Sequence, residues 1–445
     1  MIDFNEKFLY HIWDQQHLLF EKKTDCGKDI KVIFAGHLNR AKGPDFRNAI
    51  IDIDGTEIQG DIEIHINSYD WKAHNHHEDP NYNNVILHVV FSNKSGLPYT
   101  IKENGELTPI LQMNNILSTD IEKLFKESNE EQFVEKEKFC TLFSSQSHWI
   151  PQILTEYGKE RFERKVKRFL AELSFCSFDQ LLYQGIFESL GYANNKFPFY
   201  QLAKQVPYIK IQTYINQGFN KIDILSLLLH LSGLINYLPS QVESILGTQI
   251  QDSFVKQNYV ISDYHYDWNL FRLRPINHPV LRLIQGLDFI YDSALSMHEN
   301  SLTKHILKLF SFEKDNLSVS AFRKRSHLAI SKQTIEGLNT RLGISRIDLM
   351  LINIIIPLVY IYAQKMDYPD LQVYAYDLFM DFPSLADNSI NSTMRKYLTE
   401  DIEDKISKKA IMQQGLIQIY HNYCENHLCE FCTNKLDDIK ARIVL

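Results

Sequence analysis

Polar and apolar residues alternate strictly in GDIEIHI, a short segment that ends at Ile66. Asp61, Glu63 and His65 occupy one set of alternate positions, and isoleucines occupy the other set. Successive side chains of a strand point to opposite faces, so the pattern predicts a strand with two carboxyl groups and an imidazole on one face. An edge strand can also expose a polar face to avoid aggregation, and this structural role stays open at this point.

Strand-like runs recur in the first part of the chain, and helical spacing of apolar residues dominates after it. Asp54-Gly55, between two strand-like runs, is typical of a tight hairpin. From about residue 117 onward, apolar residues recur at helical spacing, as in FDQLLYQGIFESLGY. We therefore expect an α+β fold with a small mixed-sheet N-terminal domain at 1–115 and a large all-α C-terminal domain at 116–445.

Composition and charge narrow the class of protein. The 445 residues are 44% hydrophobic and 23% charged, as in a soluble globular protein, and the net charge of −8 provides no global basic field for nucleic acid. The N-terminal residues lack the pattern of a signal peptide, and six cysteines do not indicate a disulfide framework. The two most apolar segments, at 222–238 and 346–363, are interpreted as buried helices, although the second approaches membrane-spanning length. We expect a cytoplasmic protein with no membrane partner.

The segment KERFERKVKRF is basic, although the chain as a whole has a net negative charge. It places Arg161, Arg164, Lys165 and Arg168 at helical spacing. Such a helix face is either solvated or in contact with phosphate groups, and both interpretations stay open.

Two carboxylates are predicted to converge at one end of the sheet. Asp45 begins one strand after a Gly-Pro pair, and Glu63 lies in the middle of the strand that follows the hairpin. Converging carboxylates can hold Mg²⁺ or Mn²⁺, which prefer oxygen ligands. His65 points to the same face as Glu63, so we expect it to act as general base, metal ligand or phosphate contact.

These residues resemble the core of the PD-(D/E)xK nuclease superfamily, which has a restriction-endonuclease-like fold. The resemblance implies that Asp45 and Glu63 bind a metal ion, with Glu6 on the preceding helix as a third ligand. His65 occupies the position of the superfamily's lysine, and Lys72 is the nearest amine that follows it. The implied reaction is hydrolysis of a phosphodiester.

Over most of its length the chain also resembles an uncharacterised bacterial domain-of-unknown-function family (DUF2851-like). The residues that carry this resemblance are GPDF, GDIEIHI, DWKAHNHHEDPNYNNVILHVVF, FRLRPINHP, INIIIPLVYIYA and the final YCENHLCEFC. The resemblance implies a domain layout and no biochemical activity.

Titratable residues are dense in the loop that follows the carboxylate strand. His74 and His76 form a His-x-His spacing that is suited to metal binding, and we take both as candidate ligands. His88 follows in an apolar strand, as either a core histidine or a functional one. A cupin-like sandwich that holds a metal here would need mostly antiparallel strands, whereas the nuclease fold needs a crossover within residues 67–84.

The C-terminal end carries a cysteine cluster, with Cys424, Cys429 and Cys432 within nine positions. Clustered cytoplasmic thiols favour Zn²⁺ or an iron–sulfur cluster, although three thiols without a metal are also possible. The fourth ligand would be His421, His427 or Cys26.

The sequence lacks a phosphate-binding glycine-rich loop, a dinucleotide fingerprint and a serine-hydrolase elbow. The expected function is a metal-dependent nucleic-acid-processing protein, with nuclease activity on DNA or RNA as its reaction. The expected catalytic residues are Asp45, Glu63, His65 and Glu6. Two alternatives stay open: a non-catalytic interaction scaffold, and a cupin-like metal-binding domain that acts on a small molecule.

Overall fold

The computed structural model separates into two compact units, described here one at a time. One unit contains the N-terminal sheet together with residues 416–445, and the other contains most of the helices. The residues described are 6–39, 42–118, 149–257, 266–295, 301–310, 318–332, 335, 337–338, 340–396, 406, 408–426, 429, 432 and 439.

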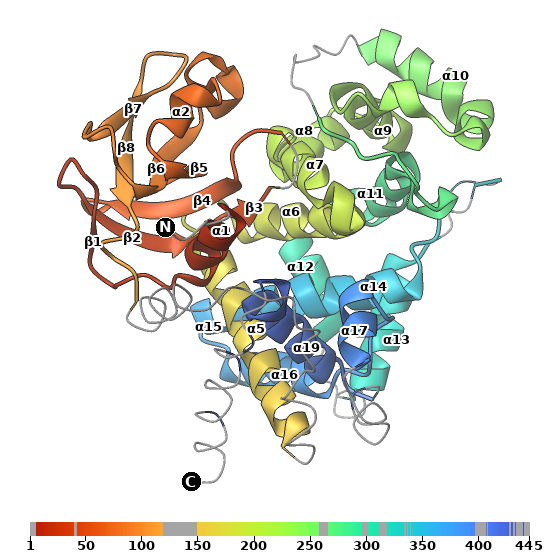
Figure 1. Ribbon diagram of the computed structural model, residues 1–445. Coiled ribbons are helices and arrows are strands. Elements are labelled where there is room, and N and C mark those ends of the chain that lie inside the picture. Colours follow the sequence, from red (N-terminus) through yellow and green to blue (C-terminus); the bar gives the residue numbers. More distant parts are fainter. Residues whose placement is uncertain are drawn as a thin grey trace. The chain divides into compact units, whose positions relative to one another are not determined.

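The N-terminal unit is built on one mixed eight-stranded sheet preceded by helix α1 (Glu6–Gln15) (Figure 1). The strand order is β1-β2-β4-β5-β6-β8-β7, and β3 pairs with β4. The strands are β1 (Lys22–Lys23), β2 (Asp29–Phe34), β3 (His37–Leu38), β4 (Phe46–Ile53), β5 (Thr56–Asn67), β6 (Val85–Ser92), β7 (Tyr99–Ile101) and β8 (Leu107–Gln112).

The direction of pairing changes at β5. Strands β4 and β5 form the expected antiparallel hairpin, and Asp54 and Gly55 at its turn both have positive φ, of 53° and 83°. Strand β5 pairs in parallel with β6, which in turn pairs in parallel with β8. The crossover from β5 to β6 contains α2 (Asp70–Ala73) and two short 3₁₀ helices, η1 (His76–Glu78) and η2 (Pro80–Tyr82). The other strand pairs of the sheet are antiparallel, so the crossover between the parallel strands β5 and β6 is the feature that agrees with the nuclease-like expectation.

The two faces of β5 have different coverings. Ile62 and Ile64 belong to a buried apolar cluster that includes Leu9, Ile12 and Trp13 of α1. The opposite face carries Glu63 and His65, and residues of the crossover contact it. The alternating pattern therefore predicted the strand correctly, but its polar face is buried rather than an exposed edge.

The rest of the chain is helical, which confirms the expected α+β class. Local caps define several helix starts: Ser177 accepts a bond from Gln180 N, and Asn220 forms a capping box with Asp223. The helices are α5 (Ile150–Glu172), α6 (Phe178–Leu190), α7 (Tyr192–Gln205), α8 (Tyr208–Asn216), α9 (Lys221–Leu231), α10 (Ser240–Gln257), α11 (Pro279–Leu295), α12 (Leu302–Leu307), α13 (Val319–Ile330), α14 (Ile344–Met350), α15 (Ile356–Lys365), α16 (Pro369–Asp381), α17 (Ser389–Arg395) and α19 (Ala410–Asn422). The domain boundary near residue 115 stays a prediction.

One helical stretch in the described part of the chain, Ile344–Lys365, is long and apolar enough to cross a membrane by length and composition. It comprises α14, a π-helical turn and α15, and 72% of its most apolar window is buried inside the protein. A core helix of a soluble protein has the same properties, and this stretch contributes many residues to the large apolar cluster of the helical unit. The interpretation as a buried helix agrees with this packing.

Three basic side chains of α5 have partners within the protein, whereas Lys167 of the same run is exposed. Arg161 Nε and Lys165 Nζ each donate to Gln414 Oε1 at 2.9 Å. Arg168 binds Glu172 and Glu188, with its shortest contacts at 2.8 and 2.6 Å. These side chains are engaged within the helical unit.

The close approach of β5 and β6 generates a prediction about stability. A Cβ atom on Gly60 would lie 2.3 Å from Ile86 Cγ2 and 2.8 Å from the Asn84 carbonyl oxygen. We expect Gly60→Ala to lower the free energy of unfolding by about 1–3 kcal/mol, because overpacking forces the strands apart. Chemical denaturation measures the change. On α10, the nearest atom to a Cβ on Gly247 is Glu243 Cγ at 3.5 Å, so Gly247→Ala should be neutral or stabilising. Equal effects of the two substitutions would contradict this packing.

Candidate metal centre

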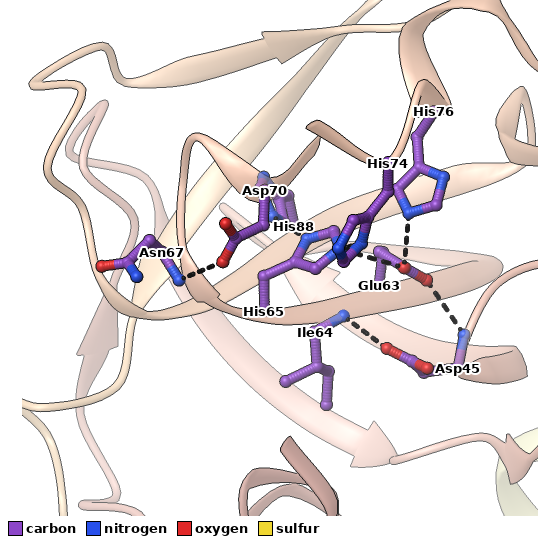
Figure 2. Close-up of polar contacts among 9 residues, drawn as sticks. All are labelled: Asp45, Glu63, Ile64, His65, Asn67, Asp70, His74, His76 and His88. Carbon is purple, nitrogen blue, oxygen red and sulfur yellow. Dashed lines mark hydrogen bonds and ion pairs between the residues drawn. The ribbon is translucent and has the colours of Figure 1, made fainter. Parts of the chain in front are cut away.

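The candidate site forms where β4 begins and β5 continues beside it. Phe46, the first residue of β4, pairs with Ile62, so the last residues of β5 extend beyond β4. The Asp45 side chain fills this position: its Oδ2 accepts a bond from Ile64 N at 2.9 Å, and its own backbone N donates to Glu63 Oε2 at 3.1 Å (Figure 2). A carboxylate thus satisfies a backbone donor that lacks a strand partner.

Asp61, two residues before Glu63 on β5, has a structural role. The pairing of β4 with β5 shifts between Phe46 and Ala49, and Asn48 within this bulge has a φ of 55°. Asp61 Oδ1 accepts a bond from Asn48 N at 2.9 Å. Asp61 therefore stabilises the bulge that precedes Asp45.

The crossover carries His74 and His76 back over the polar face of β5. Asp70 caps the turn by accepting a bond from Asn67 N at 2.9 Å, and its carbonyl accepts from His74 N at 2.9 Å. Asn75 adopts a left-handed conformation with a φ of 61°, which directs the chain from α2 into η1 at His76. The buried Trp71 anchors this segment through a 3.0 Å bond from its indole nitrogen to the Ile101 carbonyl.

Four side chains converge above β5: Glu63, His65, His74 and His76 (Figure 2). His65 Nε2 lies 3.2 Å from His74 Nδ1 and 3.4 Å from Glu63 Oε1, and His76 Nε2 lies 3.1 Å from the same oxygen. One ligand atom from each of the three histidines lies within 4.8 Å of the others. Ligand atoms at about 2.0–2.2 Å from a tetrahedral ion are about 3.3–3.6 Å apart, so the three contacts of 3.1, 3.2 and 3.4 Å are close to the spacing that a single ion needs.

His88 orients His65 from within the sheet. It is fully buried opposite Glu63 in the parallel register, and its Nε2 lies 2.9 Å from His65 Nδ1. When His65 Nδ1 donates this bond, His65 Nε2 presents its lone pair to the site. Metal-binding histidines commonly use their second nitrogen in this way, which fixes the tautomer and the ring orientation.

Burial sets the protonation of the site. It raises the pKa of Asp45 to about 8, with repulsion from Glu63 as the next cause, and it raises the pKa of Glu63 to about 8. Burial, reinforced by neighbouring histidines, lowers the pKa of His65 to about 2 and that of His88 to about 3. The imidazoles are therefore neutral at pH 7, which is the form that binds metal ions.

Helix α1 supplies two further groups. Glu6, its first residue, interacts electrostatically with His74 and His76, and burial raises the pKa of its carboxyl group. Tyr10 forms a side-chain hydrogen bond with Asp45. Asp45 is thus engaged by Tyr10 and by the Ile64 amide, which makes it a positioning group for Glu63 as the structure stands.

The structure brings most of the predicted N-terminal site residues together. Glu63, His65, His74 and His76 face one another, and Asp45 and Glu6 lie at the margin. Neither of two described lysines in this part of the chain contacts the site residues: Lys72 is exposed on α2, and buried Lys102 binds the Asn83 carbonyl and Glu106. Sequence analysis missed Tyr10 and left the role of His88 open.

The cysteine site is only partly covered by the described residues. Cys424 begins the 3₁₀ helix η8 (Cys424–Asn426), Cys429 is exposed and Cys432 is buried. Of the proposed fourth ligands, His421 Nδ1 contacts Glu425 Oε2 at 2.9 Å, Cys26 contacts Thr24, and His427 lies outside the described residues. Zinc or iron–sulfur binding at these thiols stays a prediction.

The raised carboxyl pKa values predict proton release on metal binding. Asp45 and Glu63, with pKa values of about 8, hold protons at pH 7, whereas His65, with a pKa of about 2, does not. Titration of the metal-free protein with Zn²⁺ should therefore release about one proton at pH 7, and the affinity should rise with pH up to about 8 and then level off. Calorimetry in buffers of different ionisation enthalpy measures the proton count. An affinity that levels off above pH 6.5 would instead indicate ordinary histidine titration and contradict this electrostatic description.

The contact between His65 and His88 predicts that a substitution of His88, which is not a metal ligand, lowers the affinity of the site for a metal ion. His88→Leu removes the acceptor for His65 Nδ1 and should weaken metal binding about 10–100-fold. His88→Gln retains an acceptor and should restore much of the loss. His77→Leu is the matched control, because His77 Nε2 contacts Glu78 rather than Glu63. Equal affinities of His88→Leu and His77→Leu would refute the orienting role.

Comparison with known proteins gives a family and no activity. A family model described as "Protein of unknown function (DUF2851)" matches residues 6–388. No curated protein and no solved structure matches the chain. The matched region includes every residue of the candidate metal centre and most of the helical part. The chain therefore belongs to the DUF2851 family of proteins of unknown function.

Proposed function

We propose that this protein is a metal-dependent hydrolase and that its substrate is the phosphodiester backbone of DNA or RNA. The observation that carries the proposal is the convergence of Glu63, His65, His74 and His76 at a buried strand end. Catalysis by a single metal ion needs such a set of fixed ligands together with an accessible side. His74 is exposed while the other three are buried, so the site is open on the side of the crossover.

The ligand chemistry favours a transition metal ion. Imidazole nitrogen suits Zn²⁺, Fe²⁺ and related ions, whereas Mg²⁺ prefers oxygen ligands and keeps several waters. Of the two ions expected from the carboxylate pair, Mn²⁺ fits three histidines and one glutamate better, and Zn²⁺ fits them as well. A bound divalent ion would lower the pKa of a coordinated water and neutralise charge on a phosphoryl oxygen.

The protein's own groups divide into ligands and supporting residues. Glu63, His65, His74 and His76 would hold the ion, with His88 orienting His65 and Asp45 orienting Glu63. Glu6, close to His74, is the remaining carboxyl group with a raised pKa at the margin of the site. We assign Glu6 the transfer of the proton from the attacking water, because a carboxyl group with a raised pKa is suited to general acid–base chemistry near neutral pH.

Two features support a nucleic-acid substrate over a small molecule. Asp45, Glu63-x-His65 and a helical Glu6 resemble the ligand pattern of the PD-(D/E)xK nucleases. The parallel pairing of β5 with β6 through a crossover is the arrangement that such a core requires.

Cleavage assays with matched variants test this function. The purified protein should cut DNA or RNA with Mn²⁺ or Zn²⁺ and stop when the ion is chelated. Glu63→Gln and His76→Gln should each lower the rate roughly 100-fold or more, because each removes a ligand, whereas His77→Gln should retain activity. A generic phosphodiester, bis-(p-nitrophenyl) phosphate, serves as the second substrate. If only that compound is cleaved, the substrate is a small molecule rather than nucleic acid. If nothing is cleaved with any ion, the protein is better described as a non-catalytic interaction scaffold.

The substitution His65→Lys distinguishes a role of His65 as a metal ligand from a role as the equivalent of the superfamily's lysine. The substitution restores the lysine of the superfamily, but it removes an imidazole that lies within 3.4 Å of Glu63 and 3.2 Å of His74. We expect loss of both metal binding and cleavage. Retained cleavage by His65→Lys would show instead that His65 acts in the role of the lysine.

A further inference from the structure

The helical unit contains a second concentration of charge, unrelated to the metal centre. Helix α6 contacts α7, α11 and α14, and its C-terminal end carries Glu188 and Ser189. Cationic side chains approach this end from four helices. They are Lys165 and Arg168 of α5, Lys196 of α7, Arg282 of α11 and Arg346 of α14.

The guanidinium group of Arg346 is buried and only partly satisfied. Its Nη1 donates to the Ser189 carbonyl at 3.0 Å, and its Cζ lies 3.1 Å from the centre of the Tyr192 ring. Its Nε and Nη2 have no hydrogen-bond partner among the described residues, although the residue is only 7% exposed. Buried N–H groups of a guanidinium without partners are costly, and they are donors available to an anion.

Arg282 lies on the same aromatic ring and is also buried. Its guanidinium carbon is 4.8 Å from the Tyr192 ring centre, and its Nη2 donates to the Tyr192 hydroxyl at 2.6 Å. Its Nε has no partner in the described part of the chain. Tyr192 itself has a φ of 51°, a conformation that is a rare outlier for an aromatic residue. Strained backbone of this kind is characteristic of functional sites.

The carboxylates near these cations do not balance their charge. Glu172 and Glu188 both bind Arg168. Lys165 donates to the neutral Gln414 Oε1. Burial lowers the pKa values of Lys165 and Lys196, and neighbouring arginines lower them further, whereas Glu188 opposes the shift. Arg282 likewise contributes to a lowered pKa of Arg346. An anion bound among these like charges would relieve their repulsion.

We propose that Lys165, Lys196, Arg282 and Arg346 form a binding site for a small molecule that carries a diphosphate group. Planar guanidinium groups match phosphoryl oxygens in geometry, and ammonium groups add point charges, so the set suits a compact polyanion better than a single carboxylate. Helix α7 contributes as well: it begins at Tyr192 without a side-chain cap, so its first amides can donate to a phosphoryl oxygen. Lys196 is one helical turn beyond Tyr192. Its side chain is partly accessible to solvent, which leaves a route of entry, while its ammonium group lies deep enough for burial to lower its pKa.

Binding of inorganic pyrophosphate to the full-length protein tests this site. Calorimetry and thermal unfolding should show saturable binding and a higher unfolding temperature than sodium chloride gives at matched ionic strength. EDTA in all samples removes metal-mediated binding, and Glu63→Gln should bind pyrophosphate as the wild type does.

Charge-neutral variants provide the decisive comparison. Lys196→Gln should weaken pyrophosphate binding about tenfold or more. Without pyrophosphate it should unfold at the wild-type temperature or above, because it relieves repulsion among the cations. Lys167→Gln removes a charge from an exposed position of α5 and should bind as the wild type does. Absence of saturable binding in the wild type, or unchanged binding in Lys196→Gln, would overturn the proposal.

Discussion

A carboxylate buried among imidazoles is the constraint on which the N-terminal unit depends. Glu63 is only 4% exposed, yet it has no arginine or lysine partner among the described residues. Burying an unpaired carboxylate costs free energy unless it is protonated or compensated by a cation, and its raised pKa expresses this cost. The imidazoles of His65, His74 and His76 beside it are good metal ligands. A divalent ion bound to these residues would compensate the negative charge of the buried Glu63 carboxylate.

The sheet topology produces this arrangement from ordinary elements. Strand β5 is antiparallel to β4 on one side and parallel to β6 on the other, and β4 begins one residue after Asp45. The end of β5 that extends beyond β4 therefore has room for the Asp45 side chain, and the parallel pairing requires a crossover that returns over the same face. That crossover carries His74 and His76, while the parallel register aligns His88 with Glu63.

Much of this could be predicted from sequence because it depends on local patterns. Alternation identified β5 and its polar face, Asp54-Gly55 identified the hairpin, and the spacing of His74 and His76 identified them as ligand candidates. The remainder depends on tertiary contacts. The register of a parallel pair determines that His88 meets His65, and the packing of α1 determines that Tyr10 meets Asp45. The basic spacing on α5 also gave no sign that Arg161, Lys165 and Arg168 turn inward, because helical periodicity does not identify what a charged face contacts.

X-ray absorption spectroscopy of the purified, metal-loaded protein tests the central claim most directly. The account predicts nitrogen and oxygen ligands at about 2.0–2.2 Å, with the outer-shell scattering of imidazole rings, and loss of that imidazole signal in His76→Gln. A first shell dominated by sulfur at about 2.3 Å would locate the metal at the cysteines instead. An oxygen-only shell without imidazole scattering would contradict a centre built on His65, His74 and His76.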